Sequence, residues 1–265
     1  MKMMKTEKTV RQQARAALKG NLTTLIAAAG IVYLTYLALT YANRFMLFLT
    51  NSVDLETGSV VYDFPNTPSL LALGNMALII LLSPLLNGFL RASANVARYK
   101  SCSATDVFFF FGGLTRYFRT IIINLMVFML CVIASTALDP ERWFRTLFSD
   151  LVPAQLGFDP ASFAVIFFGV LSMFIRILLY LLFVHFPLTA LALNDEIGVF
   201  ECVFVMMLFS IKNFGKLFKL MLSFAGWFLL CFLVVPALYV IPYVSVSAMT
   251  SAKWLFELDE RRVVI

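Results

Sequence analysis

The sequence predicts an all-α fold, a polytopic membrane bundle of about six transmembrane helices with short in-plane cytoplasmic helices. The first observation is composition: 61% of the residues are hydrophobic and 14% are charged, whereas soluble domains have roughly 45–50% and about 25%. The second is the mean hydropathy of +0.89. The third is the recurrence of apolar runs with the length of about 20 residues that a helix needs to cross a bilayer. These observations exclude a soluble domain, an unfolded chain and a secreted disulfide scaffold.

Four of the predicted spans are single apolar runs that carry few charged residues. Each is long enough to cross the hydrocarbon core as a helix. Pro84 is expected to kink the last turns of the second run, and the fourth run carries Arg176 and His185. The four runs are Thr24–Asn43, Ser69–Leu90, Thr120–Leu138 and Ser162–Phe186.

The last apolar block, Leu217–Leu258, is too long for a single crossing. It contains Pro236 and Pro242, and the sequence favours two helices with a turn near Pro236–Ile241. With these two helices the predicted spans number six, and the chain divides into three parts. These are a basic amphipathic cytoplasmic arm at 1–23, a six-helix transmembrane domain at 24–258 and a cytoplasmic tail at 259–265.

Basic residues lie almost entirely on one side of the predicted bundle. Of the 21 lysines and arginines, 17 fall in segments on the side of the termini and three on the other side. The positive-inside rule then predicts that both termini are cytoplasmic. Basic residues distributed in this way reflect the orientation of the protein in the membrane and face lipid. We therefore do not expect a nucleic-acid partner.

A short helical segment that ends at a glycine and leads into a span occurs three times, near Gly20, Gly112–Gly113 and Gly215. We expect each segment to lie in the cytoplasmic interface and to end in a left-handed glycine cap. In the second copy, Ser103 and Asp106 have the spacing of a capping box. The pattern favours a threefold parallel repeat of helix-plus-hairpin units. Coincidence is the alternative, because glycine commonly ends helices.

Three short motifs carry a resemblance to a known family. They are Leu18-Lys-Gly-Asn-Leu22, Ser223-Phe-Ala-Gly-Trp227 and Pro242-Tyr243. With these motifs the chain resembles, from about residue 10 to residue 258, an uncharacterised family of bacterial integral membrane proteins, domain-of-unknown-function family 975. It is more distantly similar to the membrane domain of some glycerophosphodiester phosphodiesterases. The resemblance implies a multi-pass protein of the bacterial cytoplasmic membrane with a role in phospholipid or envelope biology.

Arg176 is the most specific candidate for a functional residue. A charge inside a span is costly, so its guanidinium should face a partner, a water-filled cavity or, by snorkelling, the headgroups. Tyr180 lies one helical turn away, and Asn75 and Asn124 fall in the second and third predicted spans. The four residues indicate a ligand site for an anion, and the alternative is an arginine that reaches the headgroups.

Other polar and aromatic clusters have plainer interpretations. His185 stands alone and is interpreted as structural. Asp195, Glu196 and Glu201 either cap and solvate a helix start or serve as acid–base groups or cation ligands. Two aromatic stretches either anchor the chain at the interface or hold a hydrophobic ligand; they are Phe108–Phe111 and Phe204–Phe209.

Three function classes fit this chain. The preferred one is a non-enzymatic, lipid-interacting scaffold or accessory protein of the bacterial cell envelope, with no catalytic residue, cofactor or metal. The second is a transporter or flippase of a lipid-like or amphipathic compound that uses Arg176 as an anion site. The third, an intramembrane lipid-modifying enzyme, requires a catalytic constellation that the sequence does not present. The expected partners are anionic phospholipids on the cytoplasmic face, and a protein partner or a second copy of the chain. We expect the lipid to be contacted at four basic interface residues, Arg98, Lys100, Arg116 and Arg119.

Overall fold

The structure is a computed structural model, and it describes residues 7–53, 60–62, 67–138, 160–224, 226–227 and 234–258. Nearly all of its regular structure is helical. In chain order the elements are α1 (Glu7–Leu18), α2 (Leu22–Thr50), β1 (Asn51–Val53), β2 (Val60–Tyr62), α3 (Thr67–Ala97), the 3₁₀ helix η1 (Ala104–Phe111), α4 (Leu114–Ala137), α6 (Pro160–Tyr180), the π-helical turn η2 (Leu181–His185), α7 (Phe186–Leu193), the π-helical turn η3 (Glu201–Val205), α8 (Met206–Leu222) and α10 (Val234–Leu258).

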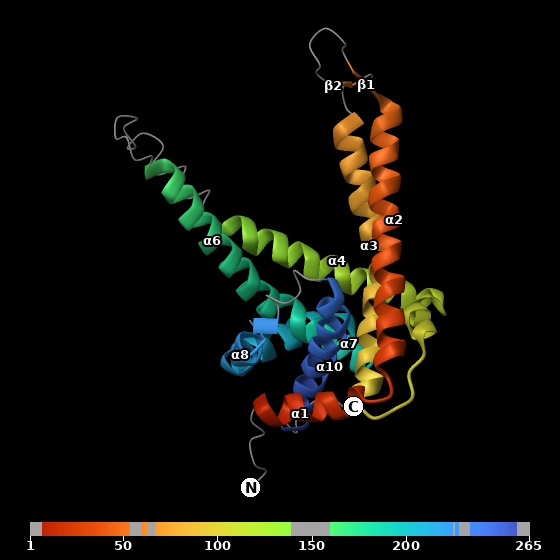
Figure 1. Cartoon of the computed structure of the whole chain (residues 1–265), viewed down its shortest axis with the longest axis vertical. Helices are drawn as coiled ribbons and strands as arrows, with labels where there is room; N and C mark the ends of the chain where they lie inside the picture. Colours follow the sequence, from red (N-terminus) through yellow and green to blue (C-terminus); the bar gives the residue numbers. More distant parts are fainter. Residues whose placement is uncertain are drawn as a thin grey trace.

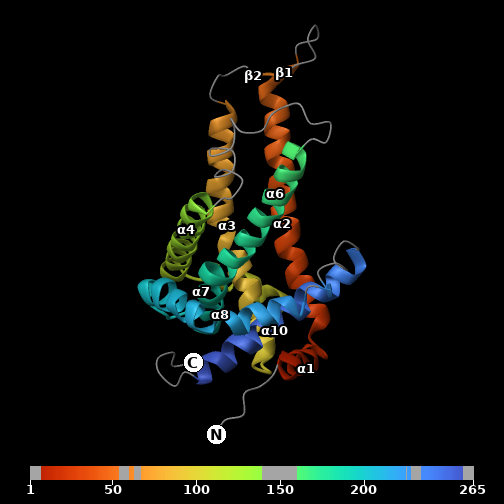
Figure 2. The ribbon, with the colours of Figure 1, turned by 90° about the vertical axis from the view of Figure 1, so that its left-hand side faces the viewer.

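Helices α2 and α3 form a long hairpin (Figure 1). At its far end β1 and β2 pair antiparallel, with Ser52 opposite Val61. Apart from this short strand pair, the predicted all-α fold is confirmed for the described part of the chain. Helices α4 and α6 extend away from the hairpin at an angle, and α1, α7, α8 and α10 gather at the end opposite the strands (Figures 1 and 2).

Four helices of the described chain are long and apolar enough to cross a membrane, which is the character of a membrane protein. Their outer faces expose large apolar side chains, as lipid-facing surfaces do; examples are Leu34, Ile79, Phe128, Met129, Val170 and Met173. The four segments are Leu22–Ala42, Met76–Ala97, Leu114–Ala137 and Phe167–Leu193. They correspond to the first four predicted spans, whereas the predicted total of six is not confirmed.

The last apolar block folds differently from the prediction. Helix α10 runs without interruption from Val234 to Leu258, across the predicted turn at Pro236–Ile241. Pro236 falls in the first turn of α10, where its missing N–H has no helical partner to lose. Pro242 lies inside the same helix. The expectation that these two prolines mark the turn is therefore wrong.

The glycine caps were predicted correctly at only one of three positions. Gly20 follows α1 with a φ of +93°, in the left-handed region. Gly112 has a φ of −72° and Gly113 is extended at −176°, where it begins α4. Gly215 lies in the interior of α8, which continues to Leu222. The threefold repeat is not confirmed, and the predicted left-handed caps of its second and third copies are wrong.

The buried core lies at the end of the molecule where α1, α3, η1, α7 and α10 meet. Fully buried apolar side chains from distant parts of the sequence pack there, including Leu25, Val107, Phe186, Leu191, Tyr243 and Met249. Helix α1 packs against α10, so the described beginning and end of the chain lie at this same end. The predicted tail at 259–265 lies outside the described residues.

Candidate functional site

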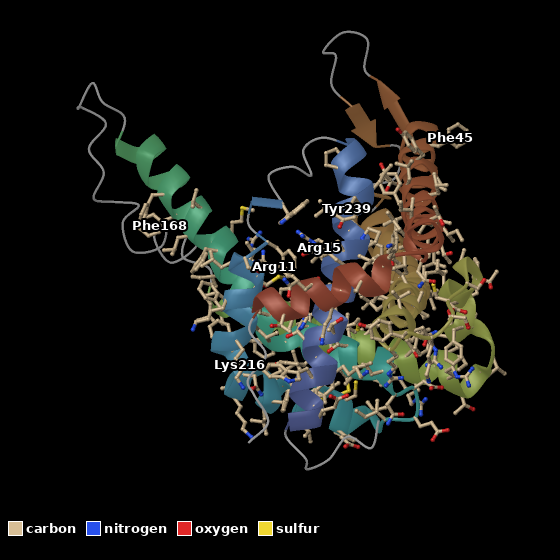
Figure 3. The ribbon with its side chains drawn as sticks, turned by 60° about the horizontal axis from the view of Figure 1, so that its bottom comes forward. Arg11, Arg15, Phe45, Phe168, Lys216 and Tyr239 are labelled. Atoms are coloured by element: carbon tan, nitrogen blue, oxygen red, sulfur yellow. The ribbon has the colours of Figure 1, made fainter. Side chains whose placement is uncertain are left out.

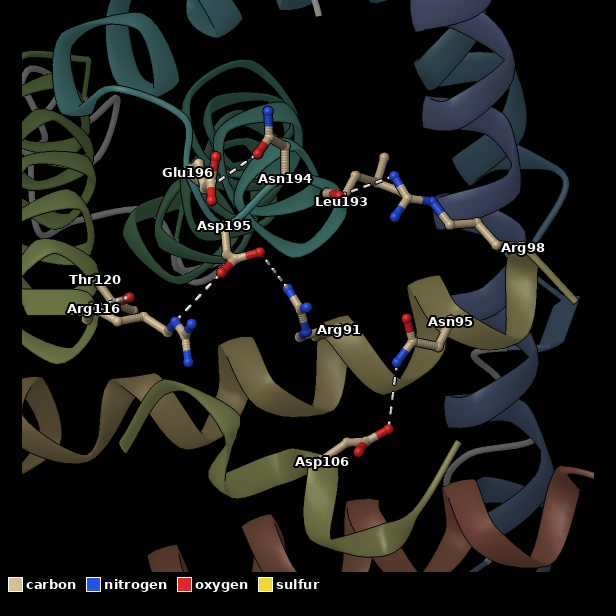
Figure 4. A network of polar contacts seen from close by, with 10 residues as sticks. All are labelled: Arg91, Asn95, Arg98, Asp106, Arg116, Thr120, Leu193, Asn194, Asp195 and Glu196. Carbon is tan, nitrogen blue, oxygen red and sulfur yellow. Dashed lines mark hydrogen bonds and ion pairs between the residues drawn. The ribbon is translucent and has the colours of Figure 1, made fainter. Parts of the chain in front are cut away.

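The candidate site begins with three polar residues on the last turns of α3. Arg91, Asn95 and Arg98 follow one another at spacings of four and three residues, which places them on one face of the helix. This face meets η1 and the end of α7, two segments that also pack on α3. Asn95 binds Asp106 of η1, Arg98 binds Leu193 at the end of α7, and Arg91 binds Asp195 in the loop that follows α7 (Figure 4).

Asp195 joins two arginines that come from different helices. Its Oδ1 accepts a hydrogen bond from Nη1 of Arg91 at 3.0 Å, and its Oδ2 lies 3.3 Å from Nε of Arg116 in α4 (Figure 4). The Arg91 and Asp195 side chains are about one-fifth exposed, and Arg116 is more open. The carboxylate therefore ties the loop after α7 to both α3 and α4.

Phe109 of η1 lies under both guanidinium groups. The Cζ atoms of Arg91 and Arg116 are 3.5 Å and 4.2 Å from the centre of its ring. Arginine stacks favourably on an aromatic face, and this contact adds to the two ion pairs. We call Arg91, Arg116, Asp195 and Phe109 the arginine clamp.

The helix η1 that presents Phe109 is held by the predicted capping box. The Ser103 side chain accepts from the main chain of Thr105, and Asp106 accepts from the Ser103 main chain at 3.2 Å. Asp106 also accepts a hydrogen bond from the amide of Asn95 at 3.4 Å. The sequence prediction of this cap is confirmed, and the cap positions η1 against α3.

Arg98 and Arg119 extend the basic character of this end. The guanidinium of Arg98 donates to the main-chain oxygen of Leu193, the last residue of α7, at 2.9 Å. Burial lowers the pKa of Arg98, and the nearby charge of Arg91 lowers it further. Within the described chain, Nε of Arg119 is buried without a hydrogen-bond partner. Arg98 and Arg119 thus add positive charge to this end of the molecule, whereas Asp195 forms its ion pairs with Arg91 and Arg116.

The four predicted lipid-interface residues are divided between interior and surface. Arg98 and Arg116 are half-buried and bind the protein's own oxygen atoms, as described above. Arg119 is also half-buried, whereas Lys100 is exposed. Asp195, predicted as part of an acidic cluster at a helix start, instead forms the two ion pairs of the clamp.

The predicted ligand site of Arg176, Tyr180, Asn75 and Asn124 stays a prediction, and the structure describes three of these side chains. Asn124 donates to Ser83 Oγ at 2.7 Å and accepts from the amide of Asn87 at 3.1 Å, so its amide links α4 to α3. Arg176 and Tyr180 are both on an exposed face of α6. The side chain of Asn75 lies outside the described residues.

The remaining candidates are mostly packing residues. His185 is buried in η2 with its ring 5.2 Å from that of Phe186, as expected of a structural histidine. In the two aromatic stretches, Phe110 is buried in the core and Phe209 packs on Phe186, while Phe204 is exposed. Within the described chain, no group of His, Cys, Asp and Glu could hold a metal ion.

Residues from two of the motifs that carried the family resemblance, Ser223, Trp227 and Tyr243, contact α1. Arg11 donates to the main-chain oxygen of Ser223 at 3.4 Å, and Arg15 lies over the rings of Trp227 and Tyr243 at 5.9 Å and 5.4 Å. Figure 3 shows Arg11 and Arg15 pointing from α1 toward Tyr239, whose ring stacks on Tyr243. These contacts fix the amphipathic N-terminal helix to the last part of the chain.

Sequence reasoning missed Arg91 and Asn87 as site residues, and it named Phe109 only within the aromatic stretch Phe108–Phe111. The spacing of Arg91, Asn95 and Arg98 at the end of a hydrophobic run was the signal available for the first, because it marks a polar helix face. Comparison with protein-family models, with curated proteins and with solved structures finds no match. The geometry of this chain alone therefore supports the functional argument.

Proposed function

We propose that this chain is a non-enzymatic integral membrane protein that binds anionic phospholipid at the arginine clamp and its surroundings, and serves as a scaffold or accessory protein in the bacterial cell envelope. The observation that carries the proposal is the convergence of Arg91 and Arg116 on Asp195 and Phe109. Arg98 and Arg119 stand in the same basic region.

The charge balance of the clamp favours an anion. Two guanidinium groups share one carboxylate, so one positive charge is left over within the clamp. Each guanidinium has five N–H donors in a planar fork, of which Arg91 donates one to Asp195, while Arg116 forms an ion pair with the same carboxylate. A lipid phosphate suits such a fork, because it accepts two parallel hydrogen bonds.

The position of the clamp at the end of a span also favours a lipid. Arg91 lies near the end of the candidate span Met76–Ala97, and Arg116 lies near the start of Leu114–Ala137. A basic group near an anionic membrane surface contributes about 1 kcal/mol to lipid attraction. By the positive-inside rule this would be the cytoplasmic face of a bacterial membrane.

The test is the ratio of phosphatidylglycerol to phosphatidylethanolamine that co-purifies from a mixed membrane, measured by mass spectrometry of extracted lipid. We expect the wild type to enrich phosphatidylglycerol, and Arg98→Gln and Arg116→Gln to reduce the enrichment about threefold to fivefold each. Lys219→Gln is the matched control, because Lys219 is an exposed cation of α8 outside the clamp. Equal recovery of neutral and anionic lipid by the wild type would overturn the proposal.

A further inference from the structure

A second polar site lies apart from the arginine clamp, between α1, the end of α3 and the last turns of α10. It is a cavity of about 110 Å³. Thr250, Lys253, Trp254 and Glu257 follow a spacing of three, four and seven residues along α10, so one face of this helix forms most of the wall. The polar and aromatic lining residues are Gln13, Tyr99, Thr250, Lys253, Trp254 and Glu257.

Glu257 supplies a carboxylate to the lining of this cavity. It pairs with Lys253, whose Nζ lies 3.9 Å from Oε1, and the two side chains are about one-third and one-half exposed. The order Lys then Glu along a helix is the less favourable one for such a pair. Glu257 also lies in the last turn of α10, where the helix dipole disfavours a negative charge. A ligand cation at this carboxylate would offset the unfavourable interaction of Glu257 with the helix dipole.

The oxygen atoms of the lining suit a donor with several N–H groups. The hydroxyl of Thr250 donates its proton to the main-chain oxygen of Val246 at 2.8 Å, so its remaining capacity toward the cavity is that of an acceptor. Glu257 contributes carboxylate oxygens, and Gln13 carries an amide oxygen. A primary ammonium has three N–H donors, whereas a quaternary ammonium has none.

Two aromatic rings complete the lining. Trp254 and Tyr99 both border the cavity, and aromatic faces attract cations. Tyr99 has a φ of +57° because it lies in the left-handed cap that ends α3, where its N–H donates to the Val96 oxygen and that of Lys100 to the Asn95 oxygen, each at 2.9 Å. Its side chain is 68% exposed at the end of a candidate span, which is the depth that tyrosine favours in membranes.

We propose that this cavity binds the primary ammonium of a phosphoethanolamine group, with the ammonium at Glu257, Thr250 and Trp254. The incoming ammonium takes the place of Lys253 at the carboxylate. The lysine has a flexible four-carbon side chain, and its ammonium turns to the phosphate of the same ligand. The site is independent of the arginine clamp, which selects a negative charge.

The experiment uses the full-length protein, delipidated in mild detergent and presented with phosphatidylethanolamine and phosphatidylcholine of identical acyl chains. Native mass spectrometry counts each bound lipid. We expect at least about a tenfold preference for phosphatidylethanolamine, because trimethylation removes every N–H donor. Glu257→Gln and Thr250→Val should each bring the preference close to one. Glu196→Gln, at an exposed acid outside the cavity, should leave it unchanged.

A soluble competitor then identifies the source of the group. Displacement of the lipid by glycerophosphoethanolamine but not by glycerophosphocholine means that the headgroup alone is recognised. Retention of the lipid despite both competitors, with the tenfold preference intact, means that the occupant is the intact lipid. Equal binding of the two lipids by the wild type, or full preference in a monodisperse Glu257→Gln variant, would overturn the proposal. This experiment does not test the proposed anionic-lipid function. That function is judged by the enrichment of phosphatidylglycerol, so either proposal can fail while the other stands.

Discussion

Gly88 of α3 lies directly against the main chain of Val107 in η1. A methyl group at position 88 would overlap the Val107 carbonyl oxygen and would come within 2.6 Å of its Cα. The main chain of Val107 cannot move aside as a flexible side chain can. Only glycine, which has no Cβ, therefore fits at position 88. The close approach brings η1 onto α3, and it thereby places Phe109 under Arg91.

The first prediction is that Gly88→Ala destabilises the protein by about 1–3 kcal/mol, the usual cost of overpacking. Gly30→Ala is the matched control, since nothing lies within 4 Å of a Cβ built at that position in α2. Apparent melting temperature in detergent measures both variants. An unchanged melting temperature for Gly88→Ala would contradict the close packing of η1 on α3.

The second prediction concerns the amide pair between α3 and α4. Asn87 is fully buried and donates to Asn124 at 3.1 Å. Asn124→Leu should cost about 0.6–1.7 kcal/mol, the range for interhelical hydrogen bonds in membranes. Asn87→Leu with Asn124→Leu should cost less than the sum of the single changes, because neither amide is then left unpaired.

Additive single and double changes in that cycle would show that the two amides do not act as a pair. The lipid-binding profile of Asn124→Leu should equal that of the wild type, as Asn124 is engaged with Asn87 and Ser83. A selective loss of bound anionic lipid in Asn124→Leu would favour the ligand role that the sequence indicated.

The third prediction is that Asp195→Asn lowers stability by about 1–2 kcal/mol, between the values for exposed and buried ion pairs. The neutral amide leaves two guanidinium groups close together on one aromatic ring. Their repulsion is screened by salt, so added salt should recover part of the lost melting temperature. Glu196→Gln is the neighbouring control, and an equal loss in both variants would argue against the clamp.

The fourth prediction concerns Cys202, whose thiol is fully buried and lies 3.2 Å from the main-chain oxygen of Pro187. Burial raises its pKa from 9.0 to about 12, and the charge of Glu201 adds to the shift. The thiolate is the reactive form, so N-ethylmaleimide at pH 8 should leave Cys202 unmodified in the folded protein. Peptide mass spectrometry, with the detergent-denatured protein as control, measures the modification.

The same shift gives a pH dependence. Because the folded pKa lies above the unfolded value, the folded state holds the proton more tightly, and this contribution is complete below about pH 9. Stability should then fall as pH rises from about 9 toward 12, and Cys202→Ala should reduce this fall. Rapid modification of Cys202 at pH 8 would contradict the buried placement.

The sequence determined the features that depend on local composition and spacing. Apolar runs of membrane-spanning length predicted four helices that the structure contains, because a helix that satisfies its own backbone is the stable form of such a run. The Ser103–Asp106 capping box and the left-handed Gly20 were also predictable, since each involves residues within one turn. The positions of the prolines did not predict where a helix ends. Pro242 lies inside α10, because the apolar run around it favours helix on both sides.

Tertiary structure alone decided which polar side chains meet. Arg91 and Asp195 are 104 residues apart in the chain, and Arg11 and Ser223 are 212 apart. Nothing in their local sequence specifies such pairs, because the partner depends on how α3, α4 and the loop after α7 are brought together. Packing also decided that Asn124 contacts Asn87 and Ser83, since an amide at a helix interface forms its hydrogen bonds with whatever polar groups the neighbouring helix presents.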